Sequence, residues 1–393
     1  MSKIKFLDLG MQPIANNFLS DEHDIDNEYK FHLTVTFDDE TKLVSLSDFV
    51  SPELMFNDSY VYYSSMSKTM RSHFEDISAR LMSNFSPRSI LEIGSNDGVF
   101  LKNFNPEIAI SVEPCGNFAK ITRDLGYTTY KEFWTSQLAR KIAFNHGKQD
   151  LIFSANCMCH IQNIEEAFDL ISTSLSANGV FVFEDPSLLK MMQRRSYDQI
   201  YDEHAHIFSV TSLNKVLEKS NLEIFKVENL DVHGGSNRIY ACHKGTRNID
   251  KSVKDNINKE SIFGLCDIEA YNRFSNDVIK SKYQLIDLLS ELKRKGYKIV
   301  SYGATSKSTT VFNYCKIGPD LIDYIIDTTP NKQGKLSPGA HIPVVSPEIG
   351  LDDTIDYAFL GAWNYEKEIS RKEKKFLKNN RFITHVPYVR FIK

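Results

Sequence analysis

Short apolar runs that end abruptly in turn residues recur through the middle of the chain. Residues 90–93, 109–112 and 151–155 read ILEI, AISV and LIFSA. Runs of this length and character predict strands that are buried on both faces, as in a parallel sheet. Segments with helical periodicity separate them, such as IEEAFDLISTSL at 164–175. This alternation predicts a doubly wound α/β unit from residue 89 to about residue 244.

Two more apolar segments close this unit. Residues 222–230 (LEIFKVENL) and 236–244 (SNRIYACHK) each fit a strand, and DVHGG joins them. Gly234 and Gly235 supply the positive φ angles that a tight connection between antiparallel strands requires. We therefore expect a parallel sheet that ends in an antiparallel hairpin.

The flanking segments have different patterns. Residues 1–75 hold short strand-like pieces separated by acidic turns, so we expect a small lobe with little core of its own. Residues 248–393 begin with polar helices and continue as a second α/β unit, in which KIVSYGATSKSTTVFN predicts a strand, a glycine turn and a helix. The sequence thus predicts three domains, over 1–75, 76–247 and 248–393.

Composition narrows the class of protein. The chain has 393 residues and a net charge of −4, which gives no basic field for nucleic acid or for an anionic membrane. The start carries no apolar segment typical of a signal peptide, and no apolar run approaches the ~20 residues that cross a bilayer. Six scattered cysteines indicate a reducing compartment. We expect a cytoplasmic protein, a monomer or weak homodimer, that acts on a small molecule.

Residues 89–101, SILEIGSNDGVFL, carry the most informative motif. An apolar strand enters a turn from Gly94 to Gly98, and Val99 is expected to open a helix. A strand, a glycine turn and a helix form a nucleotide-type ligand site at the carboxyl edge of a parallel sheet. The middle glycine of the dinucleotide pattern G-x-G-x-x-G is absent, which disfavours a pyrophosphate.

Acidic residues around this turn indicate which ligand it binds. Glu92 and Asp97 bring negative charge to the turn, and Glu113 ends the next strand, where an acid can bond both ribose hydroxyls. Carboxylates repel a pyrophosphate but suit a sulfonium ligand with an amino group. The prediction is therefore S-adenosylmethionine, with Asn96 and the two turn glycines in the same site. An ordinary α/β turn with incidental acids is the alternative.

The strand 150–156 ends in Asn156-Cys157-Met158-Cys159-His160. In a doubly wound sheet this position faces the ligand crevice, so we expect Asn156 and Cys157 beside the cofactor and His160 beside the substrate. His160 could instead cap the following helix or satisfy core groups. Metal binding by Cys157, Cys159 and His160 is not expected, because neighbouring residues in this order do not converge as a tetrahedral site needs.

A run of titratable residues follows the fifth strand. Tyr201, Glu203 and His204 lie within four positions, where loops that face the substrate are expected. Histidine is the usual general base near neutral pH, and a carboxylate can fix its tautomer. A solvated helix face is the alternative interpretation of such a run.

Two further segments could bind an anion. Arg238, in HGGSNR, could bind a phosphate or carboxylate through two parallel hydrogen bonds, or it could be an exposed arginine on a hairpin. Gly303, Thr305 and Lys307 open the second strand–turn–helix unit, where backbone NH groups, hydroxyls and one ammonium suit a diphosphate. The spacing is not that of a P-loop, and an ordinary βα turn is the alternative.

The chain resembles the three-domain nucleotide-sugar C-methyltransferases, which methylate C3 of 4-keto deoxysugars carried on a nucleoside diphosphate. The resemblance rests on motifs that follow one another along nearly the whole chain: LDLGMQPIANNFL, YVYYSSMS, LEIGSNDGVFL, ANCMCHI, YDQIYDEHAHIFS, HGGSNR, SYGATSKS and NKQGKLSPGAHIPV. It implies an α/β protein: a class I methyltransferase domain with a Rossmann-like seven-stranded sheet, a small amino-terminal lobe and a carboxyl-terminal Rossmann-like α/β domain.

The resemblance also implies roles for individual residues. Glu203 and His204 would provide the base that removes the proton alpha to a ketone, and the enolate carbon would attack the sulfonium methyl. Tyr201 and His160 would line the active site. The cofactor site would include Tyr62 and Ser65, and the nucleotide-sugar site of the carboxyl-terminal domain would include Lys332.

One feature departs from the family. Its members usually carry two cysteine pairs in the amino-terminal lobe that bind structural zinc, but no cysteine precedes Cys115 here, and TFDDET stands at 36–41. We therefore expect a lobe without metal. The departure leaves two alternatives open: O- or N-methylation of another nucleotide-linked acceptor, and a non-catalytic module that binds a nucleotide sugar.

Overall fold

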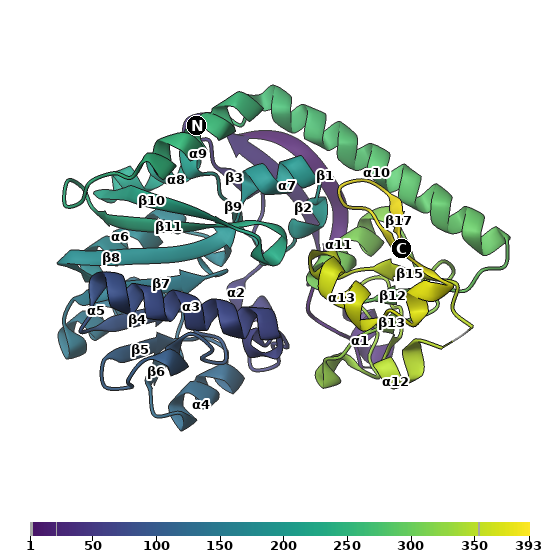
Figure 1. Ribbon diagram of the computed structural model, residues 1–393, viewed down its shortest axis with the longest axis horizontal. Coiled ribbons are helices and arrows are strands. Elements are labelled where there is room, and N and C mark those ends of the chain that lie inside the picture. Colours follow the sequence, from purple (N-terminus) through teal and green to yellow (C-terminus); the bar gives the residue numbers. More distant parts are fainter. Residues whose placement is uncertain (1–2, 21, 353) are drawn as a thin grey trace.

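The strands form three sheets, with four, seven and six strands, in the part of the chain that the computed structural model describes, residues 3–20, 22–352 and 354–393. Figure 1 shows the seven-stranded sheet on one side, the six-stranded sheet on the other, and the first strands of the chain between them. Helix α10 (Ile268–Arg294) runs across the top of this view from one side to the other. Within those ranges no helix combines the length and apolar character that crossing a bilayer requires.

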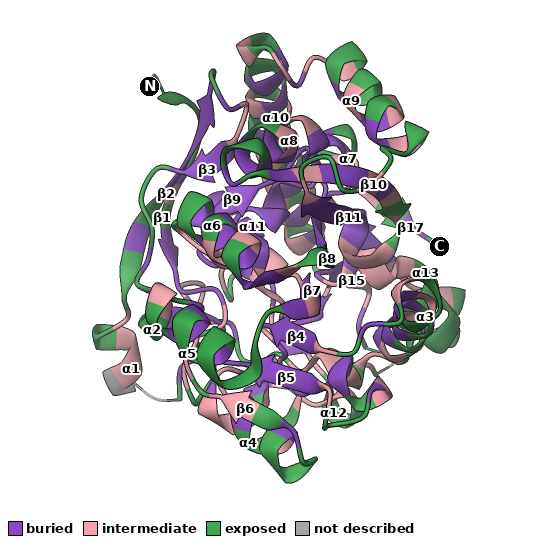
Figure 2. Cartoon of the chain, turned by 90° about the vertical axis from the view of Figure 1, so that its left-hand side faces the viewer, coloured by how far each residue is buried: buried purple, intermediate pink, exposed green. Residues whose placement is uncertain are grey.

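The seven-stranded sheet has the order β10-β11-β8-β7-β4-β5-β6. Strand β11 runs antiparallel to both of its neighbours, and the other neighbouring pairs are parallel. This is the predicted class I methyltransferase sheet with its closing hairpin. Figure 2 shows its central strands buried between helices whose outer faces are exposed. The strands are β4 (Ile90–Ile93), β5 (Ala109–Val112), β6 (Thr128–Tyr130), β7 (Gln149–Ala155), β8 (Leu175–Pro186), β10 (Leu222–Leu230) and β11 (Ser236–His243).

Helices alternate with the strands as the periodicity predicts. Helix α3 comes before β4, and the Ser67 side chain caps it by accepting a hydrogen bond from the backbone NH of Met70. The helices are α3 (Lys68–Phe85), α4 (Gly116–Asp124), α5 (Ser136–His146), α6 (Ile164–Ser174), α7 (Leu188–Arg194) and α8 (Val210–Lys219), with 3₁₀ turns η1 (Ser64–Met66), η2 (Leu101–Asn103), η3 (Met158–His160), η4 (Tyr197–Gln199) and η5 (Val232–Gly234).

One predicted helix is wrong. After Gly98 the chain forms only the 3₁₀ turn η2, and Val99 opens no α-helix. Pro106 follows closely, and a proline disfavours the helical conformation of the residue before it. The glycine turn therefore lacks the α-helix N-terminus on which a pyrophosphate would rest, in agreement with the choice of S-adenosylmethionine.

The amino-terminal lobe builds a four-stranded sheet in the order β1-β2-β3-β9, and its last strand, β9 (His206–Ile207), comes from the middle of the chain. Its apolar face packs on α10: the ring of Tyr271 stacks on Phe37 with centroids 4.6 Å apart and contacts Phe6. The lobe therefore shares its core with other elements, as its sparse apolar content predicts. Its elements are β1 (Lys3–Pro13), α1 (Glu22–Asp26), β2 (Lys30–Asp38), β3 (Val44–Leu46) and α2 (Pro52–Met55).

The carboxyl-terminal sheet has the order β14-β13-β12-β15-β16-β17, and only the pair β16-β17 is antiparallel. The predicted strand, glycine turn and helix are β12 (Ile299–Tyr302) and α11 (Ser306–Cys315). The remaining elements are α9 (Lys251–Phe263), β13 (Ile325–Ile326), η6 (Pro330–Lys332), β14 (Val344–Val345), α12 (Pro347–Gly350), β15 (Tyr357–Leu360), η7 (Trp363–Tyr365), α13 (Glu366–Lys372), η8 (Phe376–Lys378), β16 (Arg381–Thr384) and β17 (Arg390–Ile392).

Candidate active site

The turn after β4 forms a cradle that only glycine permits. Gly94 and Gly98 both have φ of 75°, and Asn96 between them has φ of 48°. A Cβ atom on Gly94 would lie 2.6 Å from Sγ of Cys157, so a side chain there would push the end of β7 away. Asn156, with φ of 50°, bends the chain at that point and bonds through its NH to the carbonyl of Glu184. The turn and the end of β7 thus lie directly against each other.

The acids at this cradle fit the predicted cofactor. The Glu113 carboxylate accepts hydrogen bonds from the NH groups of Asn96 (2.7 Å) and Cys115 (2.8 Å), which fixes it at the edge of the turn. Glu92 is buried, and its Oε2 has no hydrogen-bond partner among the described residues. Burial and the charges of Glu113 and Asp97 raise the pKa of Glu92. A buried carboxyl oxygen without a donor suits the amino group of S-adenosylmethionine.

The predicted segment Tyr62–Ser65 lies over this turn. The NH of Ser65 donates to the Asp97 carboxylate, and the Asn96 side chain donates to the carbonyl of Tyr62 (2.9 Å). The structure therefore brings the predicted cofactor residues of the lobe and of the turn together, although more than thirty positions separate them in the sequence.

His204 is held with one ring nitrogen available. Its Nδ1 donates to the carbonyl of Gln199 at 2.6 Å, so a neutral ring carries no proton on Nε2. Burial, His160 and the ammonium of Lys307 all lower the pKa of His204. The rings of His160 and Tyr201 lie 5.4 Å and 4.1 Å from it, measured between centroids. The predicted residues His160, Tyr201 and His204 therefore converge, and His204 has the protonation state of a base.

Glu203 does not orient His204 as the sequence argument expects. Its carboxylate instead accepts hydrogen bonds from the side-chain amide of Asn16 (2.6 Å) and from the hydroxyl of Tyr60 (2.8 Å). The tautomer of His204 is fixed by a backbone carbonyl. Asn16 and Tyr60 were not predicted as site residues, although both lie in the motifs PIANNF and YVYYSS, which could have pointed to them.

The expected anion site at the second glycine turn is only partly correct. The NH of Gly303 donates to the carbonyl of Ile326, and the NH of Ala304 donates to the carboxylate of Asp327. The Thr305 hydroxyl caps the following helix: it accepts a hydrogen bond from a helix NH and donates to a backbone carbonyl. The Asp327 carboxylate therefore occupies one of the NH groups expected to face a phosphate. Gly303 and Thr305 serve the turn itself, which gives no support to the prediction that they bind substrate.

The two predicted lysines remain candidates. Lys332 is 7% exposed, and its Nζ donates to the carbonyl of Ala304 (2.7 Å) while it lies 5.0 Å from the ring centroid of Phe18. Burial lowers the pKa of both Lys307 and Lys332, and the nearby charge of Glu203 opposes this shift. The carboxyl-terminal domain therefore presents two desolvated ammonium groups toward the Glu203 side of the site.

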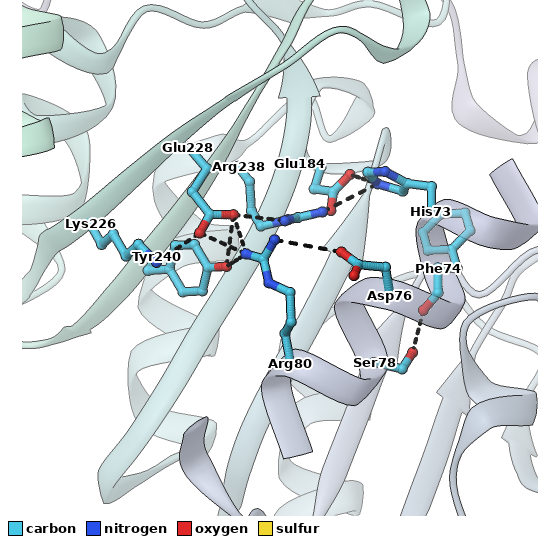
Figure 3. A network of polar contacts seen from close by, with 10 residues as sticks. All are labelled: His73, Phe74, Asp76, Ser78, Arg80, Glu184, Lys226, Glu228, Arg238 and Tyr240. Carbon is cyan, nitrogen blue, oxygen red and sulfur yellow. Dashed lines mark hydrogen bonds and ion pairs between the residues drawn. The ribbon is translucent and has the colours of Figure 1, made fainter. Parts of the chain in front are cut away.

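Arg238 belongs to a buried ion-pair network (Figure 3). Its side chain is 2% exposed, and its guanidinium donates to Glu184 (2.7 Å) and to Glu228 (2.8 Å). His73 bonds the second oxygen of Glu184 at 2.6 Å, and Arg80 pairs with Glu228. The prediction that Arg238 binds a substrate phosphate is wrong, because protein acids already engage its donors.

Comparison with known proteins assigns the family. Residues 64–227 match a family described as "Methyltransferase domain", and residues 231–387 match "C-methyltransferase C-terminal domain". The C-methyltransferase NovU of Streptomyces niveus is 31% identical over 391 residues, which is 98% of this chain and 93% of that protein. The chain belongs to the C-methyltransferase family. It is an S-adenosylmethionine-dependent methyltransferase with the corresponding Rossmann-like fold.

Two solved methyltransferase structures resemble part of this C-methyltransferase. A methyltransferase from Clostridium acetobutylicum is 14% identical, with a TM-score of 0.36, and covers 44% of this chain and 92% of its own. Magnesium protoporphyrin IX methyltransferase from Synechocystis, with bound S-adenosylhomocysteine, is 11% identical, with a TM-score of 0.32, and covers 44% of this chain and 83% of its own. Neither likeness bears on the substrate.

Metal ligands do not lie where the family places them. Residues 1–56 match a family described as "Putative zinc binding domain", yet this segment of the C-methyltransferase has no cysteine and does not fit a thiolate zinc site. In the described part of the chain, Cys159, His160 and His204 form a three-residue group with ligand atoms within 4.8 Å of one another. Cys157 is not part of this group, and His204 joins Cys159 and His160 from another segment, a combination that the sequence pattern did not predict.

Proposed function

We propose that this C-methyltransferase methylates a carbon next to the ketone of a nucleotide-activated sugar, with His204 as the general base. The observation that carries the proposal is the bond from Nδ1 of His204 to the carbonyl of Gln199, which leaves Nε2 as a proton acceptor inside a buried site. A base of this kind is needed for carbon nucleophiles, because a carbon next to a ketone attacks only after it has lost a proton.

The cofactor residues orient the methyl donor. S-adenosylmethionine, when bound, supplies an electrophilic methyl group. Glu92 would bind the cofactor's amino group, and Glu113 the ribose hydroxyls, from the positions where backbone NH groups hold its carboxylate. Gly94 and Gly98 allow the close approach of the main chain, and the lobe segment over the turn excludes water.

The remaining residues act on the substrate. His204 would take the proton alpha to the ketone. Tyr201, whose pKa burial raises well above 10, keeps its proton and can donate to the enolate oxygen, and the positive charge of Lys307 lowers the energy of the same anion. Lys307 and Lys332 also favour a substrate that carries a diphosphate. Asn16 and Tyr60 hold the Glu203 carboxyl in place by hydrogen bonds, and burial raises its pKa although these contacts and the two lysines oppose the shift.

Hydrogen exchange tests the proposal directly. A panel of keto sugars on nucleoside diphosphates is incubated with the protein and S-adenosylhomocysteine in D₂O. Deuterium incorporation next to the ketone, detected by mass spectrometry, is expected for the true substrate, because proton removal does not need the methyl donor. If an acceptor is methylated without exchange at carbon, the result supports O- or N-methylation instead. If the protein binds the cofactor but methylates no acceptor, the result supports a binding module.

Replacing Glu92 tests the cofactor site. Glu92→Gln keeps the shape of the side chain but removes the carboxyl group, whose charged form the cofactor's ammonium would stabilise on binding. A hydrogen bond between charged groups contributes about 1.5–3 kcal/mol, so affinity for S-adenosylmethionine is expected to fall by roughly 10- to 150-fold in calorimetry. Glu107→Gln, at an exposed acid before β5, is the matched control. Unchanged affinity in Glu92→Gln contradicts the assignment.

The pH profile tests the link between Lys307 and His204. Because the pKa of His204 is lowered, the base stays unprotonated below pH 6.5, and kcat/KM is expected to fall only as pH drops through that depressed pKa. Lys307→Met removes one cause of the lowering, so the acidic limb is expected to move to higher pH. Lys259→Met, at an exposed lysine of α9, serves as control. An acidic limb that does not move in Lys307→Met excludes this coupling.

Chelator treatment tests the lobe without cysteines. Because residues 1–56 offer no thiolate, the C-methyltransferase is expected to keep its melting temperature in EDTA. Elemental analysis after dialysis into metal-free buffer is expected to find no stoichiometric zinc. A fall in melting temperature that added zinc reverses would show that the lobe holds a structural ion.

A further inference from the structure

Three potential metal ligands meet beside the proposed base. Cys159 and His160 come from the turn η3 after β7, and His204 comes from the segment before β9. One ligand atom from each lies within 4.8 Å of the others. The chain therefore brings one sulfur and two imidazole nitrogens close together from two segments more than forty residues apart.

Each imidazole has a ring nitrogen that could bind a ligand. The Nε2 atom of His160 is buried and has no hydrogen-bond partner within the described ranges. Nδ1 of His204 donates to the carbonyl of Gln199, which leaves Nε2 of the neutral ring without a proton. A backbone carbonyl on the second ring nitrogen is the usual support of a metal-bound histidine. Two independent observations, a buried nitrogen without a donor and a supported imidazole, thus point to a ligand at this place.

We propose that Cys159, His160 and His204 bind a zinc ion reversibly, and that the bound ion inhibits the enzyme by occupying the lone pair of His204. One thiolate and two imidazoles suit Zn²⁺, with a fourth position left for water. Bonds of about 2.0–2.3 Å to a tetrahedral ion place ligand atoms roughly 3.3–3.7 Å apart, so the side chains need to close by only about 1 Å.

Binding has a defined proton balance. The Cys159 thiol loses its proton to solvent when the sulfur bonds the ion, and both imidazoles bind through neutral nitrogens. While the ion is present, Nε2 of His204 accepts no proton from the sugar, so methyl transfer stops. The inhibition rests on the proposed function, whereas the metal site itself does not.

Cobalt is a spectroscopic probe of the site. Co²⁺ titrated into the full-length protein is expected to give a thiolate charge-transfer band at one equivalent, and calorimetry with Zn²⁺ is expected to give one site. Cys159→Ser is expected to abolish the band and to weaken zinc binding by about 100-fold. Cys266→Ser, at a partly exposed cysteine between α9 and α10, is expected to bind as the unchanged protein does.

Activity gives the second measurement. Zn²⁺ is expected to inhibit methyl transfer in the unchanged protein and in Cys266→Ser, and EDTA is expected to restore the activity. Methyl transfer by Cys159→Ser is expected to continue in the presence of Zn²⁺. Absence of the cobalt band in an active enzyme overturns the site and leaves the proposed function intact. A band that Cys159→Ser retains also overturns it. A Cys159-dependent band without inhibition overturns the claim that the ion blocks His204 and removes support for His204 as the base.

Discussion

His204→Ala is expected to lower turnover by about 10²- to 10⁴-fold while affinity for S-adenosylmethionine stays near that of the unchanged protein. The residue supplies the proton acceptor, and its contacts are with Gln199, His160 and Tyr201, away from the cofactor turn. The measurement is single-turnover methyl transfer, together with calorimetry of cofactor binding and a melting curve on the same sample.

A matched control separates chemistry from folding. His146→Ala removes an exposed histidine at the end of α5 and is expected to leave turnover unchanged. If His204→Ala is fully stable and fully active, His204 is not the base. If the variant loses stability and activity together, the hydrogen bond from His204 to the Gln199 carbonyl is structural, and the catalytic role of His204 is rejected.

Arg238→Ala is expected to destabilise the protein by about 3–5 kcal/mol, the usual cost of removing one partner from a buried ion pair. The substitution leaves Glu184 facing only His73 and leaves Glu228 with its more exposed partners (Figure 3). Chemical denaturation measures the loss. Arg88→Ala is the control, because Arg88 is 93% exposed and its pair with Asp150 spans 3.9 Å.

The network also makes stability depend on pH. Hydrogen bonds from Lys226, Arg80 and Arg238 outweigh burial and lower the pKa of Glu228 from 4.5 to about 2. A carboxyl with a depressed pKa stabilises the fold fully above its unfolded value, and the stabilisation is lost as pH falls from about 4.5 toward 2. Arg238→Ala is expected to weaken this dependence. A variant that keeps its stability but loses affinity for the nucleotide sugar would restore Arg238 to the substrate site.

Local patterns determined much of the fold. Apolar runs of strand length and the glycines at 94, 98, 234 and 235 predicted the parallel sheet, its cofactor turn and its closing hairpin, because strand burial and positive φ depend on neighbouring residues. The same patterns predicted a helix after Gly98 that does not form, and the segment makes only one 3₁₀ turn, η2.

The tertiary structure decided which side chains meet. His160, Tyr201 and His204 could be placed in one site from the sequence, because each follows a strand at the same edge of the sheet. The partners of Glu203 could not, since Asn16 lies 187 positions away in another lobe.

The same reason explains the other differences. Arg238 pairs with Glu184, 54 positions away, and Cys159 and His160 lie close to His204 from another segment. The sequence pattern predicts which residues are buried and which residues end strands. It does not predict which buried polar groups pair with each other, because pairing depends on distances between side chains that are known only from the folded chain.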